Sequence, residues 1–181
     1  MKTAYICGPL TELLSDPWGI LRIMRWMINF LPWLLFGRRL VHFWTAQEAK
    51  AFYVKVADHI ERLEGNRPFV PHEHYDPIRH AHFTPVQVDE AERNQVCNKT
   101  WLLVVVAVAP SWGGGIEVEW AHQNNIRVVI LWQDGMKLSR LLRGNPAIDK
   151  VLNYAMEEEA LEKLSEYFES VLFRKIANVL A

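Results

Sequence analysis

The sequence predicts an α/β fold: a doubly wound, flavodoxin-like or Rossmann-like parallel sheet of four to five strands with helices on both faces. Strand and helix patterns alternate along the chain. The run from Trp101 to Ala109 is apolar without alternation and β-branched in its middle, as in a strand covered on both faces. The 181 residues, half of them apolar, suit one well-packed domain spanning residues 1–181 and are few for two.

Apolar runs bounded by turn residues predict the strands. The first run ends at Gly8 and Pro9, which start a turn. A polar loop rich in histidine follows the second run and extends to Thr84. The expected strands cover residues 3–7, 68–70, 101–109 and 127–132.

Apolar positions at helical spacing and capping residues predict the helices. Thr45 and Glu48 form a candidate capping box for the first of them, and Thr84 with Pro85 starts the helix that precedes the central strand. The first helix is expected to cover residues 46–64. Further helices are expected at 116–124 and 157–180, with a short helical turn at 138–143.

An inserted apolar segment, rich in tryptophan and spanning residues 18–44, does not fit this alternation. Arg22, Arg25, Asn29 and Pro32 interrupt it, which excludes a transmembrane helix. We expect a helical hairpin that packs on the core or on a sister subunit. Peripheral membrane contact through its Trp residues and the Arg38-Arg39 pair is the alternative.

The charge and cysteine content favour a cytoplasmic protein with a small-molecule partner. Twenty basic and twenty-one acidic residues leave a net charge of -1, so no global field indicates nucleic acid as a partner. Cys7 and Cys97 show no metal spacing and suggest a reducing compartment. Residues 2–8 are predicted to form a strand that ends in glycine rather than a signal peptide.

The segment Pro110-Ser-Trp-Gly-Gly-Gly-Ile-Glu117 directly follows the predicted central strand. Its glycines are expected to form a turn with positive φ, and a helix beginning near Ile116 would direct amide groups at an anion. Ser111 adds a hydroxyl group, and Glu117 would face the same crevice. The alternative is a tight connection in which Glu117 merely complements the helix dipole.

Three segments resemble the nucleoside 2-deoxyribosyltransferase superfamily, whose members cleave N-glycosidic bonds. They are Tyr5-Ile-Cys-Gly-Pro9, the segment ending in Glu117 with Ala121 one turn on, and Leu138-Ser-Arg-Leu-Leu-Arg-Gly144. The last is similar to a segment of the 2′-deoxynucleoside 5′-phosphate N-hydrolases. The resemblance covers about 130 residues, and the Glu117 motif is its most specific part.

The resemblance implies roles for individual residues. Glu117 would be the nucleophile that attacks C1′ of the sugar, and Tyr5 would hydrogen-bond Glu117 or the sugar. A homodimer is implied, in which Ser139 reaches the 5′-phosphate in the partner's site. No cofactor is implied. The residues expected to bind substrate in addition are Gly8, His72, His74, Ser111, Gly113, Gly114 and Gly115.

The chain also departs from the family pattern. Ungapped alignment from Glu117 places Arg93 where the family has its second catalytic carboxylate, so we choose Glu92, with Asp89 as the alternative. Either could be an ordinary solvated helix carboxylate. The glycine-rich, arginine-containing stretch of the hydrolases is missing after the first strand. Residues that could supply the charge instead are Arg22, Arg38, Arg39 and Arg143.

The histidine loop contains His72, His74, His80 and His82 and could in principle bind a metal ion. Because family members need no metal and place a polar loop beside the base and sugar, we expect substrate contact by His72 or His74 instead. The preferred function is hydrolysis of a (deoxy)nucleoside 5′-monophosphate at its N-glycosidic bond. The alternatives are a nucleoside deoxyribosyltransferase and a non-catalytic nucleotide-binding or membrane-associated sensor.

Overall fold

The computed structural model describes residues 2–9 and 46–180, with side chains described up to residue 173. Four parallel strands form one sheet in the order β1-β2-β3-β4. Phe69 adds an isolated parallel bridge to Tyr5 of β1, with hydrogen bonds of 2.9 and 3.0 Å to Ala4 and Ile6. If this bridge is counted as the second strand along the chain, the strand order is flavodoxin-like. The predicted doubly wound fold is confirmed. The strands are β1 (Thr3–Cys7), β2 (Thr100–Ala107), β3 (Arg127–Gln133) and β4 (Ile148–Tyr154).

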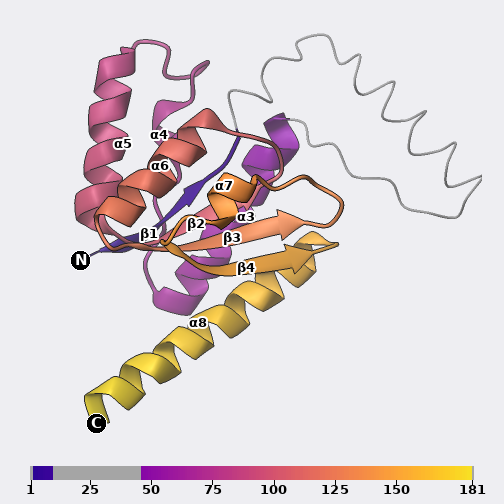
Figure 1. The fold of residues 1–181 in the computed structure, drawn as a ribbon. Coiled ribbons are helices and arrows are strands. Elements are labelled where there is room, and N and C mark those ends of the chain that lie inside the picture. Colours follow the sequence, from indigo (N-terminus) through magenta and orange to yellow (C-terminus); the bar gives the residue numbers. More distant parts are fainter. Residues whose placement is uncertain (1, 10–45, 181) are drawn as a thin grey trace, which may run out of the picture.

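Helices cover both faces of the sheet (Figure 1). Alternate strand residues serve the two faces: Ile6 and Val104 pack with α3 and α8, whereas Leu103 and Ile130 pack with α5 and α6. Two short helices, α4 and α7, lie in the connections. The helices are α3 (Ala46–Glu64), α4 (Pro71–Tyr75), α5 (Pro85–Lys99), α6 (Trp112–Gln123), α7 (Arg140–Arg143) and α8 (Glu157–Leu180).

The helix that precedes the central strand begins where the sequence predicts. The Thr84 hydroxyl accepts a hydrogen bond from the Gln87 amide at 3.3 Å, and the Gln87 side chain accepts one from the Thr84 amide at 2.9 Å. This reciprocal capping box stabilises the first turn of α5 with Pro85 at its first position.

The glycine segment differs from the prediction. Helix α6 begins at Trp112, not near Ile116, because the Ser111 hydroxyl caps it by accepting a hydrogen bond from the Gly114 amide at 3.1 Å. The three glycines therefore form the first helical turn. Among the described glycines, positive φ occurs only at Gly65 and Gly135. Glu117 consequently lies in the second turn of α6 rather than the first.

Further predictions were wrong in part. Residues 68–70 form an isolated bridge rather than a strand, and the expected loop from Pro71 to Thr84 contains α4. Strand β4 was not predicted, because it lies at one edge of the sheet and its short apolar stretches are interrupted by Asp149, Lys150 and Asn153. Strand β3 extends one residue further than expected, and the turn predicted at 138–143 becomes helical only at Arg140.

The insertion at 18–44 and the cap at Thr45 lie outside the described residues, as do Arg22, Arg38 and Arg39. Within the ranges that the structure describes, no helix combines the length and the apolar character needed to cross a membrane.

Candidate active site

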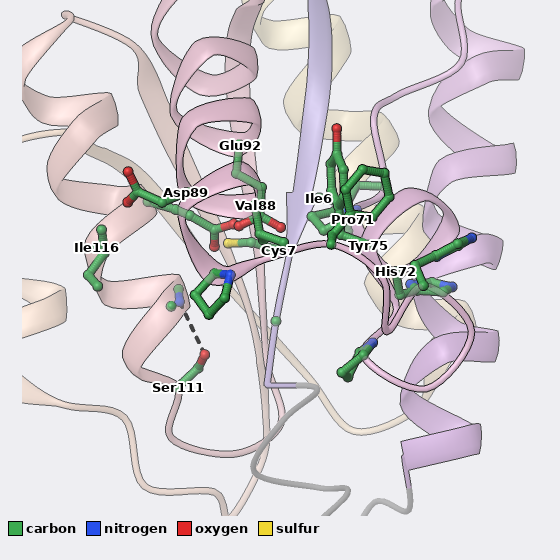
Figure 2. Close-up of a pocket in the computed structure, with 18 of the residues that line it drawn as sticks. Ile6, Cys7, Pro71, His72, Tyr75, Val88, Asp89, Glu92, Ser111 and Ile116 are labelled. Atoms are coloured by element: carbon green, nitrogen blue, oxygen red, sulfur yellow. Dashed lines mark hydrogen bonds between the residues drawn. The ribbon is translucent and has the colours of Figure 1, made fainter.

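A cavity of about 680 Å³ lies at the carboxyl ends of β1 and β2, between α5, the start of α6 and the segment around α4 (Figure 2). This volume is in the range of roughly 300–1,000 Å³ typical of small-molecule sites, and the position is the one where doubly wound sheets bind ligands. The polar and aromatic residues that line it include Cys7, Tyr53, His72, Tyr75, His80, Phe83, Asp89, Glu92, Ser111, Glu117 and Trp120.

Glu117 is the most buried carboxylate of this cavity, with 6% of its surface exposed. The Tyr5 hydroxyl, which is fully buried, donates a hydrogen bond of 2.5 Å to Glu117 Oε1. The Cys7 thiol also hydrogen-bonds the Glu117 side chain. Tyr5 and Cys7 are two residues apart on β1 and therefore point to the same face of the sheet. The end of one strand thus holds the carboxylate of the helix above it.

Burial dominates the electrostatics of this pair. It raises the pKa of Glu117, and the hydrogen bonds from Tyr5 and Cys7 counteract the rise. Burial also raises the pKa of Tyr5 well above its usual value, as does the charge of Glu117. Tyr5 therefore stays protonated and remains a donor. A carboxylate buried among neutral donors is costly for folding and typical of functional sites.

Glu92 on α5 is the second carboxyl group with a strongly shifted pKa. Burial, then the charges of Glu117 and Asp89, raise the pKa of Glu92 to about 8. Asp89 differs, because Arg93 one turn on contacts both its carboxylate oxygens at 2.8 and 3.0 Å. Both acids line the cavity, and Glu92 is mainly protonated at neutral pH while remaining coupled to Glu117.

The first turn of α6 brings Ser111, Gly113 and Gly114 to the cavity wall. Two of its amides are already used, since Gly114 donates to the Ser111 hydroxyl and Gly115 to the Ser111 carbonyl at 3.3 Å. The amide of Gly113 comes before these, in the first turn, where a helix can present an amide to an anion. Gly115 does not line the cavity.

Gly8 directly follows β1 and lies very close to α3. A Cβ atom at this position would lie 2.4 Å from the Tyr53 hydroxyl of α3, so only glycine fits beside that ring. The close approach brings α3 and Tyr53 to the cavity.

The structure separates the histidines. His72 lines the cavity, and among the described residues no hydrogen-bond partner meets its buried Nδ1 atom. His74 is exposed, stacks on Phe69 with ring centroids 4.5 Å apart, and does not line the cavity. His80, which sequence reasoning did not select, does. Within the described ranges, no group of three or more His, Cys, Asp or Glu side chains could hold a metal ion.

No Lys or Arg is among the described residues that line the cavity. Arg143 and Ser139 lie around α7, both exposed, and the Ser139 hydroxyl caps that helix by accepting from the Leu142 amide at 3.4 Å. Ser139 therefore does not reach this cavity within its own chain.

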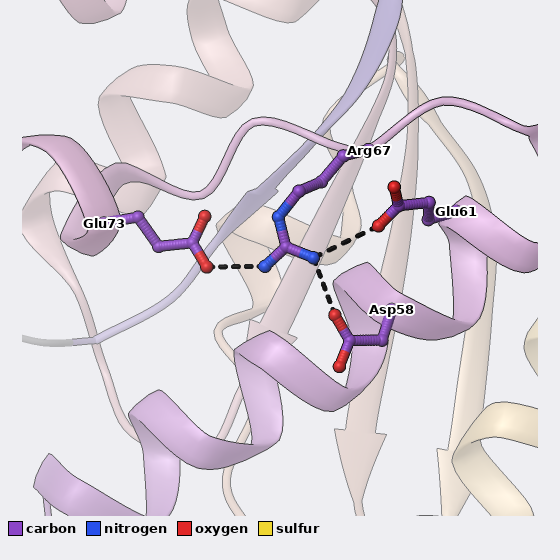
Figure 3. Close-up of polar contacts among 4 residues, drawn as sticks. All are labelled: Asp58, Glu61, Arg67 and Glu73. Carbon is purple, nitrogen blue, oxygen red and sulfur yellow. Dashed lines mark hydrogen bonds and ion pairs between the residues drawn. The ribbon is translucent and has the colours of Figure 1, made fainter.

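An ion cluster outside the cavity holds α4 in place (Figure 3). Arg67 binds Asp58 at 2.6 Å and Glu61 at 3.2 Å on α3, and Glu73 of α4 at 2.6 Å. The cluster is solvent-exposed, so its stabilising energy is small, but three carboxylates on one guanidinium restrict the orientation of α4. His72 belongs to α4, so its position depends on that of the helix.

Comparisons with known proteins bear on the fold. No protein-family model matches the chain, and no curated protein matches it. A solved structure does match: the Clostridium botulinum CMP N-glycosidase BcmB, at 20% sequence identity and a TM-score of 0.53, over 67% of this chain and 92% of the other. The chain therefore has the fold of that structure, as the sequence resemblance implied.

Proposed function

We propose that the protein is an N-glycoside hydrolase that releases the base from a (deoxy)nucleoside 5′-monophosphate through a covalent intermediate on Glu117. One observation carries this proposal: the buried Glu117 carboxylate accepts a 2.5 Å hydrogen bond from Tyr5 in a cavity that also holds the largely protonated Glu92. Two carboxyl groups with different protonation states are what retaining glycoside hydrolysis requires.

In the first step, a Glu117 carboxylate oxygen forms a bond to C1′ while the C1′–N bond breaks and its electron pair leaves with the base. Glu92 gives its proton to the departing base. Tyr5 and Cys7 keep the carboxylate aligned from below, as their hydrogen bonds indicate. The products of this step are the free base and a glycosyl ester of Glu117.

In the second step, water attacks C1′ of the ester. The ionised Glu92 now accepts a proton from that water, the ester bond breaks, and Glu117 leaves as a carboxylate. The sugar phosphate is released and Glu92 is protonated again, so the cycle closes without an external reagent.

The start of α6 is the proposed phosphate site. Ser111, Gly113 and Gly114 line the cavity there, and the first-turn amide of Gly113 with the helix dipole favours an anion. We propose that a homodimer completes this site with Ser139 of a second copy. The matched structure is described as a CMP N-glycosidase, which supports a nucleotide substrate.

Replacing Glu117 with Ala or Gln should abolish turnover, with a loss on the order of 10⁴-fold, because the proposed covalent step loses the carboxylate that attacks C1′. Nucleotide binding should largely survive. The release of free base from a panel of nucleoside monophosphates measures the first effect, and calorimetric titration measures the second. Glu119→Gln, an exposed change on the same helix, is the control. Full turnover in Glu117→Ala would contradict the nucleophile role of Glu117, whereas nucleotide binding without any base release by the wild type would support a non-catalytic sensor.

The rate should have a bell-shaped dependence on pH. Activity rises as Glu117 ionises on the acid side, and it falls as pH passes through about 8, where Glu92 loses the proton that it donates. Because Glu117 and Glu92 are coupled, the apparent pKa values of the two limbs belong to the pair and not to either residue alone. Glu92→Gln should remove the basic limb and lower kcat by roughly 10²–10⁴-fold, whereas Glu90→Gln should leave the profile unchanged. A basic limb that persists in Glu92→Gln assigns it to another group.

Incubation with a deoxynucleotide and a different free base should yield sugar phosphate and the original base only. Water reaches the glycosyl ester in the proposed mechanism, so no swapped nucleotide forms. Chromatography of the products decides, and a nucleotide carrying the added base would identify a transferase instead.

Ser139→Ala should raise KM for a nucleoside monophosphate about tenfold, because one charge-assisted hydrogen bond to phosphate is lost across the subunit boundary. KM for the corresponding nucleoside, which lacks the phosphate, serves as the control and should not change. Sedimentation analysis should show a dimer. A fully active monomer contradicts this arrangement.

A further inference from the structure

The cavity has two chemically different walls. Asp89, Glu92 and Ser111 lie on one side of it, and Pro71, Tyr75 and His72 lie on the other (Figure 2). The second wall continues through His80 and Phe83 of the loop after α4. Tyr75 and Phe83 meet edge to face with ring centroids 5.2 Å apart. Such an aromatic wall suits a planar heterocycle rather than a phosphate.

Asp76 fixes the loop that forms this wall. The residue is 1% exposed, and its carboxylate accepts hydrogen bonds from the amides of Ile78 at 2.9 Å and Arg79 at 3.0 Å and pairs with Lys50 of α3. Burial opposes ionisation of Asp76, but Lys50 and the two amides outweigh it and lower the pKa to about 2. The buried, charged side chain of Asp76 therefore anchors this loop to α3.

The same anchor sets the hydrogen-bonding state of His80. The Asp76 amide donates to His80 Nδ1 at 3.1 Å, and the His80 amide donates back to the Asp76 carbonyl at 2.7 Å. Because Nδ1 acts as an acceptor, the proton of the neutral ring resides on Nε2. His80 therefore offers a hydrogen-bond donor, held in one orientation, from the aromatic wall of the cavity.

We propose that His80 is a base-recognition residue whose Nε2–H donates a hydrogen bond to a carbonyl oxygen of the leaving nucleobase. This inference rests on the proposed function and names its substrate class: nucleotides whose base carries an exocyclic carbonyl, such as cytosine, uracil and hypoxanthine. Adenine, which has no carbonyl oxygen, is disfavoured.

The chemistry of the departing base supports a donor at this place. When the C1′–N bond breaks, its electron pair passes to the base and is delocalised onto the carbonyl oxygen. A fixed N–H donor beside that oxygen stabilises the developing charge more than it stabilises the bound substrate. Stacking on the Tyr75–Phe83 wall would hold the ring in the plane that this hydrogen bond requires.

Two substitutions separate base recognition from the structural role of His80. In Asn, the side-chain oxygen replaces Nδ1 and keeps the bond from the Asp76 amide, but no donor remains at the position of Nε2. In Gln, the side-chain amide replaces Nε2–H, and the bond from Asp76 is lost. His80→Asn therefore keeps the anchor without the donor, and His80→Gln keeps the donor without the anchor.

The experiment measures kcat/KM, and the equilibrium dissociation constant, for uracil, cytosine, hypoxanthine and adenine nucleotides. The wild type should favour the three carbonyl bases over adenine by at least about tenfold, the usual scale for one hydrogen bond in an enclosed site. His80→Gln should keep this ratio. His80→Asn should reduce it to within about threefold. His82→Asn, an exposed change in the same loop, should resemble the wild type.

A wild type that prefers adenine, or a His80→Asn variant that retains the full ratio, overturns the inference while leaving hydrolysis intact. A wild type that cleaves none of the four nucleotides overturns the proposed function instead. In that case the ratio of dissociation constants still tests His80, because base recognition needs no turnover. If the preference for carbonyl bases over adenine falls equally in His80→Asn and His80→Gln, His80 has a purely structural role.

Discussion

The hydrogen bond between Tyr5 and Glu117 is the contact on which the rest of the site depends. It joins the first strand to the helix that follows the central strand, across 112 positions of sequence. Tyr5 is in turn fixed by the parallel pairing of β1 with β2 and by its stacking on Phe69 at 5.4 Å. A shift of register by one residue would turn Tyr5 to the opposite face and leave a buried acid without its donor. The register of the sheet therefore determines whether the proposed nucleophile keeps its hydrogen bond from Tyr5.

Several features could be predicted from the sequence because they depend on local signals. Thr84 and Gln87 mark the start of α5, and the unbroken apolar run marks β2 as central. Glu117 and Tyr5 could be named because they lie in motifs that resemble a known superfamily. The helical state of the glycines was missed, since Ser111 works equally well as a turn residue or as a cap, and only the tertiary position of α6 decides between them.

Long-range contacts explain what could not be predicted. His80 becomes part of the cavity wall only because Asp76 is held by Lys50, which lies 26 positions earlier on another helix. Glu92 is distinguished from Asp89 by its burial and by the ion pair that Asp89 forms with Arg93, and neither follows from their spacing alone. Strand β4 was missed because this edge strand mixes polar and apolar residues, so it lacks the unbroken apolar run that marks β2.

The raised pKa of Glu92 has a consequence for the charge of the whole molecule. The formal net charge of -1 counts every acidic residue as ionised, so a largely protonated Glu92 removes one of the negative charges in that count. The charge that disappears is one that faces the cavity, where a phosphate dianion would otherwise meet three carboxylates without a neighbouring Lys or Arg among the described lining residues. Occupation of the cavity by an anion favours the protonated form of Glu92, so ligand binding and proton uptake are thermodynamically linked.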